Sequence, residues 1–233
     1  MAMQALLQFL KNPARAVRRA LLARKYRTPD GYDAERFWKE RHEAYGFDLR
    51  GVGYTKLTHG ENEAMYVQAR ETLLDLCREE QVDFAAARML DIGCGAGYYA
   101  QAFRESGGKE YLGVDITDAL LPRLRDAFPG FVFRQLDVST QPLEGAHDLV
   151  VMLDVTQHIT NEAKFSYAMQ NVRRSLSPQG VFLVTSWLDA QARDRFFERS
   201  RDLAAYQKEF AGFRFGTPRS FRDKFIFSIR SAS

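Results

Sequence analysis

The sequence predicts an α/β fold: a doubly wound, mostly parallel seven-stranded sheet preceded by an N-terminal helical cap. From about residue 88 onward, short apolar runs bounded by turn residues alternate with helical stretches, the pattern of a parallel sheet with crossover helices. Residues 32–81 are instead helical in period and rich in aromatic side chains. The 233 residues are 45% hydrophobic and 27% charged, a composition that supports a sizeable core.

Each element follows from its local pattern, and a pair of antiparallel strands is expected to complete the sheet. Strands are predicted at 89–91, 111–115, 131–136, 148–153, 181–186, 213–215 and 224–229, and helices at 98–106, 119–128, 162–175 and 190–209. The chain then divides into a basic N-terminal extension (1–30), a helical cap (31–84) and the main domain (85–233).

The N-terminal extension is expected to hold a short apolar helix over residues 6–10 and a second helix. Asn12 is its N-cap, Pro13 its first position and Tyr26 its approximate end, before the turn at 29–31.

Charge is uneven along the chain. Residues 1–30 hold seven basic residues and one acidic residue, which gives this segment a charge of +6. The whole chain has a net charge of +3, so the remaining residues together carry −3. A basic, modestly amphipathic helix can bind an anionic membrane surface or nucleic acid; the membrane contact would be made by residues 1–28. The alternative is a packed or solvated extension with no such partner. The acidic remainder disfavours nucleic acid as the main partner.

Several classes of protein are disfavoured. No apolar run is long enough to span a membrane, and no secretory signal is evident, so a cytoplasmic location is expected. Cys77 and Cys94 are too far apart to suggest a paired metal motif, and the histidines lack zinc-site spacing. We therefore expect no metal site; the oligomeric state is left open.

The sharpest motif is a glycine loop, residues 91–98 (Asp-Ile-Gly-Cys-Gly-Ala-Gly-Tyr), that joins a strand to a helix. Alternate glycines let the backbone bend tightly and approach a ligand at the helix N-terminus. A dinucleotide fingerprint needs a glycine where Tyr98 stands, and a Walker lysine is also missing. Asp91 would repel a diphosphate, and it would attract an ammonium group or hold ordered water beside one, which favours an amino-acid ligand.

The next two strands also end in carboxylates. Asp115 lies 24 residues beyond Asp91, where an acidic side chain accepts both hydroxyls of a ribose. Asp137 and Val138 suit an adenine, with a carboxylate for the exocyclic amine and a backbone N–H with an apolar edge for the ring. Because parallel strand ends share one crevice, a nucleoside joined to an amino acid satisfies all three positions.

This order of motifs resembles the class I S-adenosylmethionine-dependent methyltransferases over residues 85–233. The segment 176–180 (Leu-Ser-Pro-Gln-Gly) is similar to the family's turn before strand five, with Gln179 replacing a glycine. The resemblance implies S-adenosylmethionine as cofactor and a cofactor site made of Asp91, Gly93, Cys94, Gly95, Gly97, Tyr98, Asp115, Ile116, Asp137, Val138 and Asp154. Cys94 is expected to pack rather than react.

The segment 153–159 after the fourth strand is similar to that of methyltransferases in ubiquinone and menaquinone biosynthesis. The resemblance makes His158 a candidate general base, since imidazole takes a proton near neutral pH. The alternative is a structural histidine that fixes the loop. Asp154, the second catalytic candidate, is expected to hold the amino-acid end of the cofactor or to orient the acceptor.

The expected activity is methyl transfer to a small-molecule acceptor, with a hydroxyl oxygen favoured. The run 30–42 (D-G-Y-D-x-x-x-F-W-x-x-R-H) loosely resembles methyltransferases of bacterial surface-polysaccharide biosynthesis, which implies a sugar or lipid-linked glycan. Phe37, Trp38, Tyr54 and Tyr66 are candidates for a ring-shaped acceptor pocket or for core positions. The alternatives are a nucleic-acid methyltransferase and a non-catalytic cofactor-binding protein.

Overall fold

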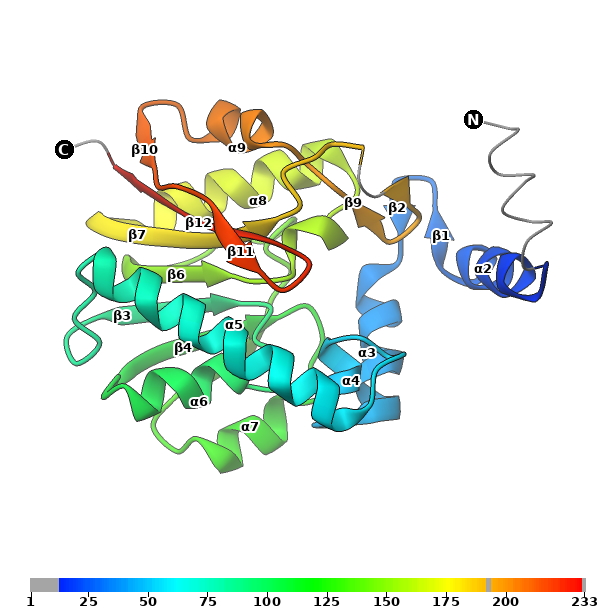
Figure 1. Cartoon of the computed structure of the whole chain (residues 1–233), viewed down its shortest axis with the longest axis horizontal. Helices are drawn as coiled ribbons and strands as arrows, with labels where there is room; N and C mark the ends of the chain where they lie inside the picture. Colours follow the sequence, from blue (N-terminus) through cyan, green and yellow to red (C-terminus); the bar gives the residue numbers. More distant parts are fainter. Residues whose placement is uncertain (1–12, 192–193, 232–233) are drawn as a thin grey trace.

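A mostly parallel sheet with helices on both faces forms the body of the protein in the computed structural model, which describes residues 13–191 and 194–231 (Figure 1). Across these residues the sheet has eight strands in the order β10-β12-β7-β6-β3-β4-β5, and β11 pairs with β12 beside that path. The strands are β3 (Arg88–Ile92), β4 (Glu110–Asp115), β5 (Val132–Gln135), β6 (His147–Met152), β7 (Leu176–Ser186), β10 (Phe213–Phe215), β11 (Arg219–Phe221) and β12 (Lys224–Ser231).

The strand pairing confirms the predicted doubly wound α/β fold. Strands β3 to β7 pair in parallel, whereas β10, β11 and β12 join antiparallel. All seven predicted strands are present, including the final antiparallel pair, and β11 is an addition. Because β3 lies between β4 and β6, the chain winds outward from β3 in both directions, which places a topological switch point at its carboxyl end.

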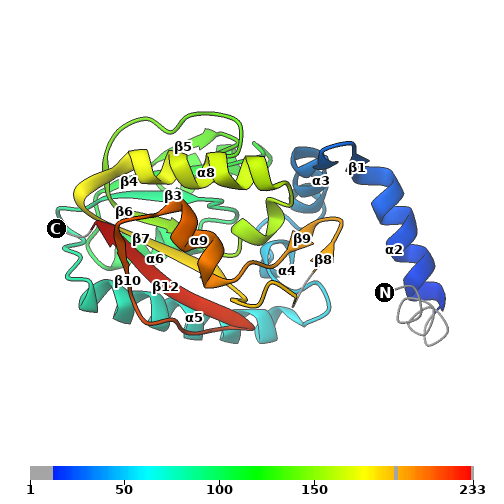
Figure 2. The same ribbon diagram turned by 90° about the horizontal axis from the view of Figure 1, so that it is seen from above.

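Two apolar layers hold the helices against the sheet (Figure 2). Side chains alternate along each strand, so on β6 Leu149 and Val151 pack with one layer while Val150 and Met152 pack with the other. The first layer contains α5 (His59–Glu79), α6 (Tyr98–Glu105) and α7 (Leu121–Ala127), and the second contains α8 (Glu162–Ser175) and α9 (Leu203–Glu209).

The N-terminal segment lies at the carboxyl ends of the parallel strands. It consists of α2 (Pro13–Tyr26), a hairpin of β1 (Arg27–Thr28) and β2 (Gly31–Tyr32), α3 (Ala34–Tyr45) and α4 (Leu49–Val52). The helix start at Pro13, its end at Tyr26 and the following turn are as predicted; the predicted helix 6–10 and the N-cap Asn12 lie outside the described residues.

Helix α2 extends away from the body of the molecule (Figure 2), and Leu21 on it is 62% exposed. None of the helices in the described stretches is long and apolar enough to cross a membrane. The membrane contact through residues 1–28 stays a prediction.

The predicted helix at 190–209 is wrong in its first half. The chain instead forms a hairpin of β8 (Asp194–Arg195) and β9 (Glu198–Arg199), and α9 starts only at Leu203, where Asp202 accepts a hydrogen bond from the Ala205 N–H. At the hairpin turn, the Phe196 ring lies 6.0 Å from Tyr32 and the Phe197 ring 5.2 Å from Phe37. These distant aromatic contacts override the local helical pattern.

Candidate active site

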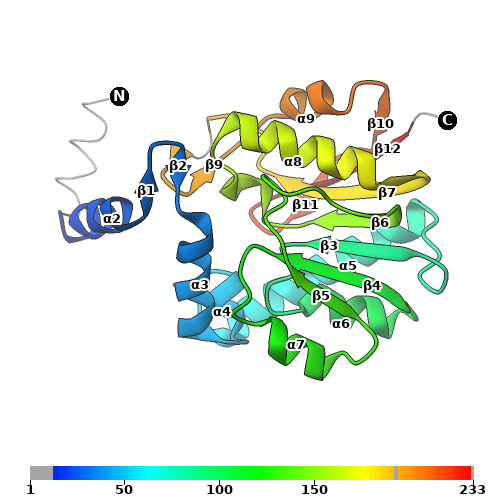
Figure 3. The same ribbon diagram turned by 180° about the vertical axis from the view of Figure 1, so that it is seen from behind.

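A cavity of about 490 Å³ lies at the carboxyl ends of β3, β4 and β6. The segment from β2 to α3 lies beyond this end of the sheet, next to the β8–β9 hairpin (Figure 3), and contributes Tyr32 and Trp38 to the lining. The predicted site residues that line the cavity are Gly93, Cys94, Gly95, Tyr98, Asp115, Ile116, Asp137, Val138, Asp154 and His158. The switch point therefore holds the cavity, as expected for a doubly wound sheet.

The glycine loop needs its glycines for both conformation and space. Gly93, Gly95 and Gly97 have φ angles of 78°, 49° and 74°, a region that side chains strongly disfavour. A Cβ on Gly93 would lie 2.3 Å from Cγ2 of Val155, and one on Gly95 would lie 2.9 Å from Cγ1 of Val52. The loop is thus clamped between two other segments, with its backbone against the cavity.

Asp91 lies behind the glycine loop and not in the cavity. Its side chain is buried, and its Oδ2 accepts a hydrogen bond of 2.7 Å from the hydroxyl of Tyr111. Burial raises the pKa of Asp91 to about 7. Neither Asp91 nor Gly97 is among the lining residues, so the Asp91 carboxylate does not itself face the cavity. Its predicted roles, attracting an ammonium group or holding ordered water, stay predictions.

Asp115 connects the second strand end to the glycine loop and to α3. Its Oδ2 accepts a hydrogen bond from the Gly95 N–H at 3.0 Å, and its Oδ1 accepts one from the Thr117 N–H at 3.1 Å. Burial raises the pKa of Asp115 and lowers the pKa of His42, a cavity residue on α3 close enough to interact with its charge. The sequence pattern did not identify His42 as a site residue.

Asp137 and Val138 form the third strand-end position. The Asp137 Oδ1 accepts hydrogen bonds from the N–H and the hydroxyl of Ser139, at 2.9 and 2.6 Å. The Val138 carbonyl accepts one from Asn171 on α8, at 2.8 Å. This bracing fixes an apolar edge beside a carboxylate, the surface expected for a purine ring.

Asp154, at the end of β6, is held by two cations from the far end of the chain. Its Oδ1 pairs with Nζ of Lys224 at 2.6 Å and its Oδ2 with Arg222, both nearly fully buried. Burial alone would raise the pKa of Asp154, but Lys224 and Arg222 hold it below its ordinary value. A carboxylate so neutralised is a poor base, so the structure favours a positioning role for Asp154.

His158 is fixed in one tautomer. Its Nδ1 lies 2.8 Å from the carbonyl oxygen of Phe197, which can only accept, so Nδ1 carries the proton and Nε2 carries the lone pair. The edge of Trp38 packs against the imidazole at 4.7 Å, and Phe197 stacks on it at 6.2 Å. Burial lowers the pKa of His158 to about 4, so the ring is neutral at pH 7 and can accept a hydrogen bond.

Arg201, which falls within the wrongly predicted helix, shapes the loop that carries His158. It is 4% exposed and donates to the carbonyls of Thr156 at 3.0 Å and Ile159 at 2.7 Å, while pairing with Glu162. Its guanidinium also stacks over Phe165 at 3.8 Å. Because these partners lie about 40 residues away in sequence, no local signal marked this residue.

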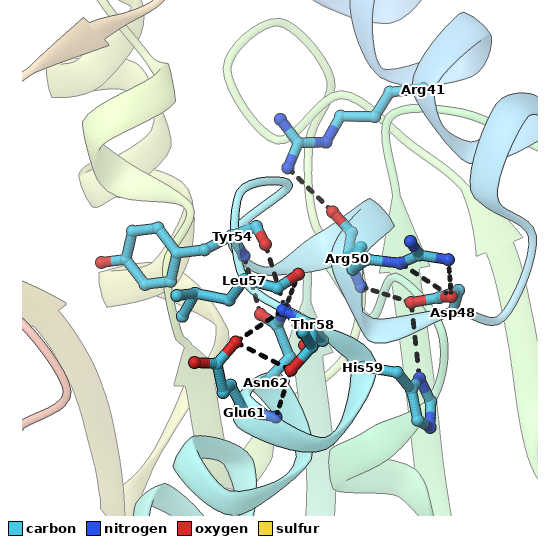
Figure 4. A network of polar contacts seen from close by, with 9 residues as sticks. All are labelled: Arg41, Asp48, Arg50, Tyr54, Leu57, Thr58, His59, Glu61 and Asn62. Carbon is cyan, nitrogen blue, oxygen red and sulfur yellow. Dashed lines mark hydrogen bonds and ion pairs between the residues drawn. The ribbon is translucent and has the colours of Figure 1, made fainter.

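A polar network fixes the connection from α3 to α5 (Figure 4). Arg41 donates to the Gly53 carbonyl at 2.7 Å, and the fully buried Asn62 accepts from the Tyr54 N–H at 2.8 Å and donates to the Tyr54 carbonyl. Thr58 and Glu61 form a capping box at the start of α5. The network holds the α4 segment, including Val52, against the glycine loop.

The candidate aromatic residues divide between two roles. Trp38 and Tyr66 line the cavity. Phe37 instead stacks on Phe197 of the β8–β9 hairpin, and Tyr54 lies 5.3 Å from the Arg222 guanidinium. The thiol of Cys94 is buried, which raises its pKa well above the ordinary value and fits the expected packing role.

The fold and the site together define a class I S-adenosylmethionine-dependent methyltransferase: a glycine loop at the switch point of a doubly wound sheet, with carboxylates at the next two strand ends. The chain belongs to the methyltransferase domain family, whose model matches residues 62–225, more than half of its length. This confirms the class predicted from the sequence, and the match includes most of α5.

Curated relatives are similar over part of their length. The chain is 31% identical over 101 residues to trans-aconitate 2-methyltransferase of Methylobacterium nodulans, which covers 43% of this chain and 38% of the relative. It is 24% identical over 161 residues to the chloroplastic tocopherol O-methyltransferase of Arabidopsis thaliana, covering 66% and 45%. The matches thus span less than half of these relatives.

Solved structures share the fold over most of the chain. N-methyltransferase NodS from Bradyrhizobium japonicum WM9, in complex with S-adenosyl-L-homocysteine, has a TM-score of 0.65 at 16% identity and covers 86% of this chain and 100% of its own. Magnesium protoporphyrin IX methyltransferase from Synechocystis PCC 6803 has a TM-score of 0.64 at 15% identity, covering 84% and 99%.

Proposed function

We propose that the protein transfers the methyl group of S-adenosylmethionine to a hydroxyl oxygen of an uncharged small molecule. The observation that carries this proposal is the tautomer of His158, whose Nδ1–H is engaged by the Phe197 carbonyl and whose Nε2 lone pair is left for the cavity. A hydroxyl must lose its proton as it is methylated, and the neutral imidazole of His158 can accept a hydrogen bond from it. With a pKa lowered to about 4 by burial, His158 is a weak base, so it takes the proton only as the O–CH₃ bond forms and the hydroxyl becomes strongly acidic.

The residues at the strand ends fit the cofactor. Asp115 offers a carboxylate for ribose hydroxyls, Asp137 and Val138 offer a purine edge, and the left-handed glycine loop leaves its backbone against the cavity. The cofactor supplies an activated methyl group on a sulfonium. The protein therefore has to bind, align and exclude water, and these are effects of positioning.

The chain's own groups perform three steps. The cap residue Trp38 and the hairpin residue Phe197 enclose the imidazole and limit access of water. His158 Nε2 accepts the proton of the acceptor hydroxyl and later releases it to solvent. Asp154, kept ionised by Lys224 and Arg222, holds the end of β6 in the left-handed conformation (φ 60°) that turns the chain toward His158.

A His158→Gln variant tests the proposal, because glutamine keeps a polar side chain but removes the base. Methyl transfer from labelled S-adenosylmethionine should fall by about 10²-fold to 10⁴-fold, while calorimetric affinity for S-adenosylhomocysteine stays within about threefold. Transfer that is unchanged in the variant would show that His158 is structural. A Gly95→Arg variant, which fills the loop, is the negative control for cofactor binding.

A further inference from the structure

The hydroxyl of Tyr32 is a buried polar group whose proton has no acceptor in the described part of the chain. Tyr32 is 8% exposed and lines the cavity, and within the described residues no hydrogen bond of ordinary geometry reaches its hydroxyl. The side chain that interacts with the hydroxyl is Trp38, whose indole N–H can only donate, so the phenol proton is left without an acceptor. Burial raises the pKa of this phenol well above its ordinary value, so it keeps its proton and acts as a donor. A buried hydroxyl whose proton lacks an acceptor lowers stability, so its retention calls for an explanation.

The ring of Tyr32 is held in place by its neighbours. It lies edge-on to Phe37 at 5.8 Å and to Phe196 at 6.0 Å, so α3 and the β8–β9 hairpin hold it from two sides. Phe37 also contacts Trp38 at 5.4 Å, and Trp38 contacts His158 at 4.7 Å. One aromatic frame therefore carries both the Tyr32 hydroxyl and the His158 imidazole.

We propose that the Tyr32 hydroxyl binds the methyl acceptor, as the hydrogen-bond donor that complements the acceptor atom Nε2 of His158. The inference rests on the proposed function and names the acceptor as an uncharged ring that bears hydroxyl groups. One hydroxyl donates its proton to His158 Nε2 as the new O–CH₃ bond forms and the S–CH₃ bond breaks. A second oxygen of the same ring accepts a hydrogen bond from Tyr32, and Trp38 offers a flat apolar wall.

Charge at this side of the cavity disfavours an anionic acceptor. Asp30, Asp33 and Glu35 line it, with Lys164 as the basic residue among its described lining. Asp33 accepts a hydrogen bond from the Arg36 N–H, and Glu35 accepts one from Gln135, but neither interaction cancels a charge. An acceptor with a carboxylate or phosphate would meet this acidic rim unfavourably.

A matched pair of variants isolates the Tyr32 hydroxyl. Tyr26 belongs to the same aromatic cluster, 5.1 Å from Phe37, but its hydroxyl donates to Glu40 at 2.6 Å and it does not line the cavity. Tyr32→Phe removes a hydroxyl whose proton has no acceptor and should raise the midpoint of urea unfolding or leave it unchanged. Tyr26→Phe removes a satisfied one and should lower the midpoint. A drop of equal size in both variants would overturn the proposal.

Binding to the protein saturated with S-adenosylhomocysteine completes the test. Catechol and methyl glucoside are the probes, because they distinguish a phenolic from a sugar ring, and benzoate is the charged control. At least one uncharged probe should bind the wild type more tightly than benzoate, and Tyr32→Phe should weaken it about tenfold while Tyr26→Phe changes it less than about twofold.

Equal affinity in wild type and Tyr32→Phe, or binding of benzoate alone, would overturn the acceptor assignment. So would the absence of binding by either uncharged ring. These results leave the methyltransferase assignment standing if S-adenosylhomocysteine still binds and His158→Gln still loses transfer, so the two failures are distinguishable.

Discussion

The two sides of the cavity are built in different ways. The cofactor side consists of strand ends and the loops that directly follow them, so Asp115, Asp137 and the glycine loop come together because parallel strands end at one edge. The acceptor side combines β2 and α3, which are adjacent in the chain, with the β8–β9 hairpin, which begins 149 residues after the end of α3. Short motifs can encode the first side, whereas the arrangement of the second depends on contacts between distant segments.

The cofactor side should be the more sensitive to small changes. Gly93→Ala places a Cβ only 2.3 Å from Cγ2 of Val155, on a backbone with φ 78°. We expect loss of about 2–4 kcal/mol in the free energy of unfolding and at least about 100-fold weaker S-adenosylhomocysteine binding, because both the loop and the helix start must move. Urea unfolding and calorimetry measure the two effects.

Gly107→Ala is the matched control for this prediction. Gly107 also has a positive φ, 89°, but nothing lies within 4 Å of a Cβ there. The Gly107→Ala variant should lose about 1 kcal/mol in the free energy of unfolding, because of backbone strain, and its cofactor binding should be unchanged. Similar losses in the two variants would mean that the clash with Val155 is unimportant.

The difference between the two sides also explains what the sequence could and could not predict. The positions of the strands, the final antiparallel pair and the carboxylates Asp115 and Asp137 followed from short apolar runs and the residues at their ends, and the glycine loop followed from its motif. Arg201 and Phe197 could not be recognised, because their partners are backbone carbonyls and rings in distant segments. Asp91 was identified as a site residue, but its side chain bonds to Tyr111 and does not line the cavity.

On the acceptor side, the burial of His158 should appear as a pH dependence of stability. The pKa is about 4 in the folded state and about 6.5 when unfolded, so the unfolded state binds a proton first as pH falls. Stability is therefore lost as the pH falls below about 6.5 toward 4. Between pH 7 and 5 the wild type should lose about 1–2 kcal/mol more than His158→Gln, measured by urea unfolding. Parallel profiles for the two proteins would argue that the imidazole is solvated.

The smallest expected effect concerns the turn that holds Asp154. Arg222 lies between β11 and β12 with φ 60°, and its buried guanidinium pairs with Asp154, 68 residues earlier. A left-handed arginine persists only where other contacts enforce it, and such strain is typical of functional sites. The ion pair and the conformation can be separated by two substitutions, because glycine accepts this φ and alanine does not.

Both Arg222→Ala and Arg222→Gly remove the ion pair and leave Asp154 with Lys224 alone, so both should lose stability. The glycine variant should be about 1 kcal/mol more stable than the alanine variant, because it also removes the backbone strain. Urea unfolding of the two proteins side by side measures this difference. If the Arg222→Ala variant is as stable as the Arg222→Gly variant, the backbone at position 222 carries no strain. Asp154 is then held in place by its ion pairs alone.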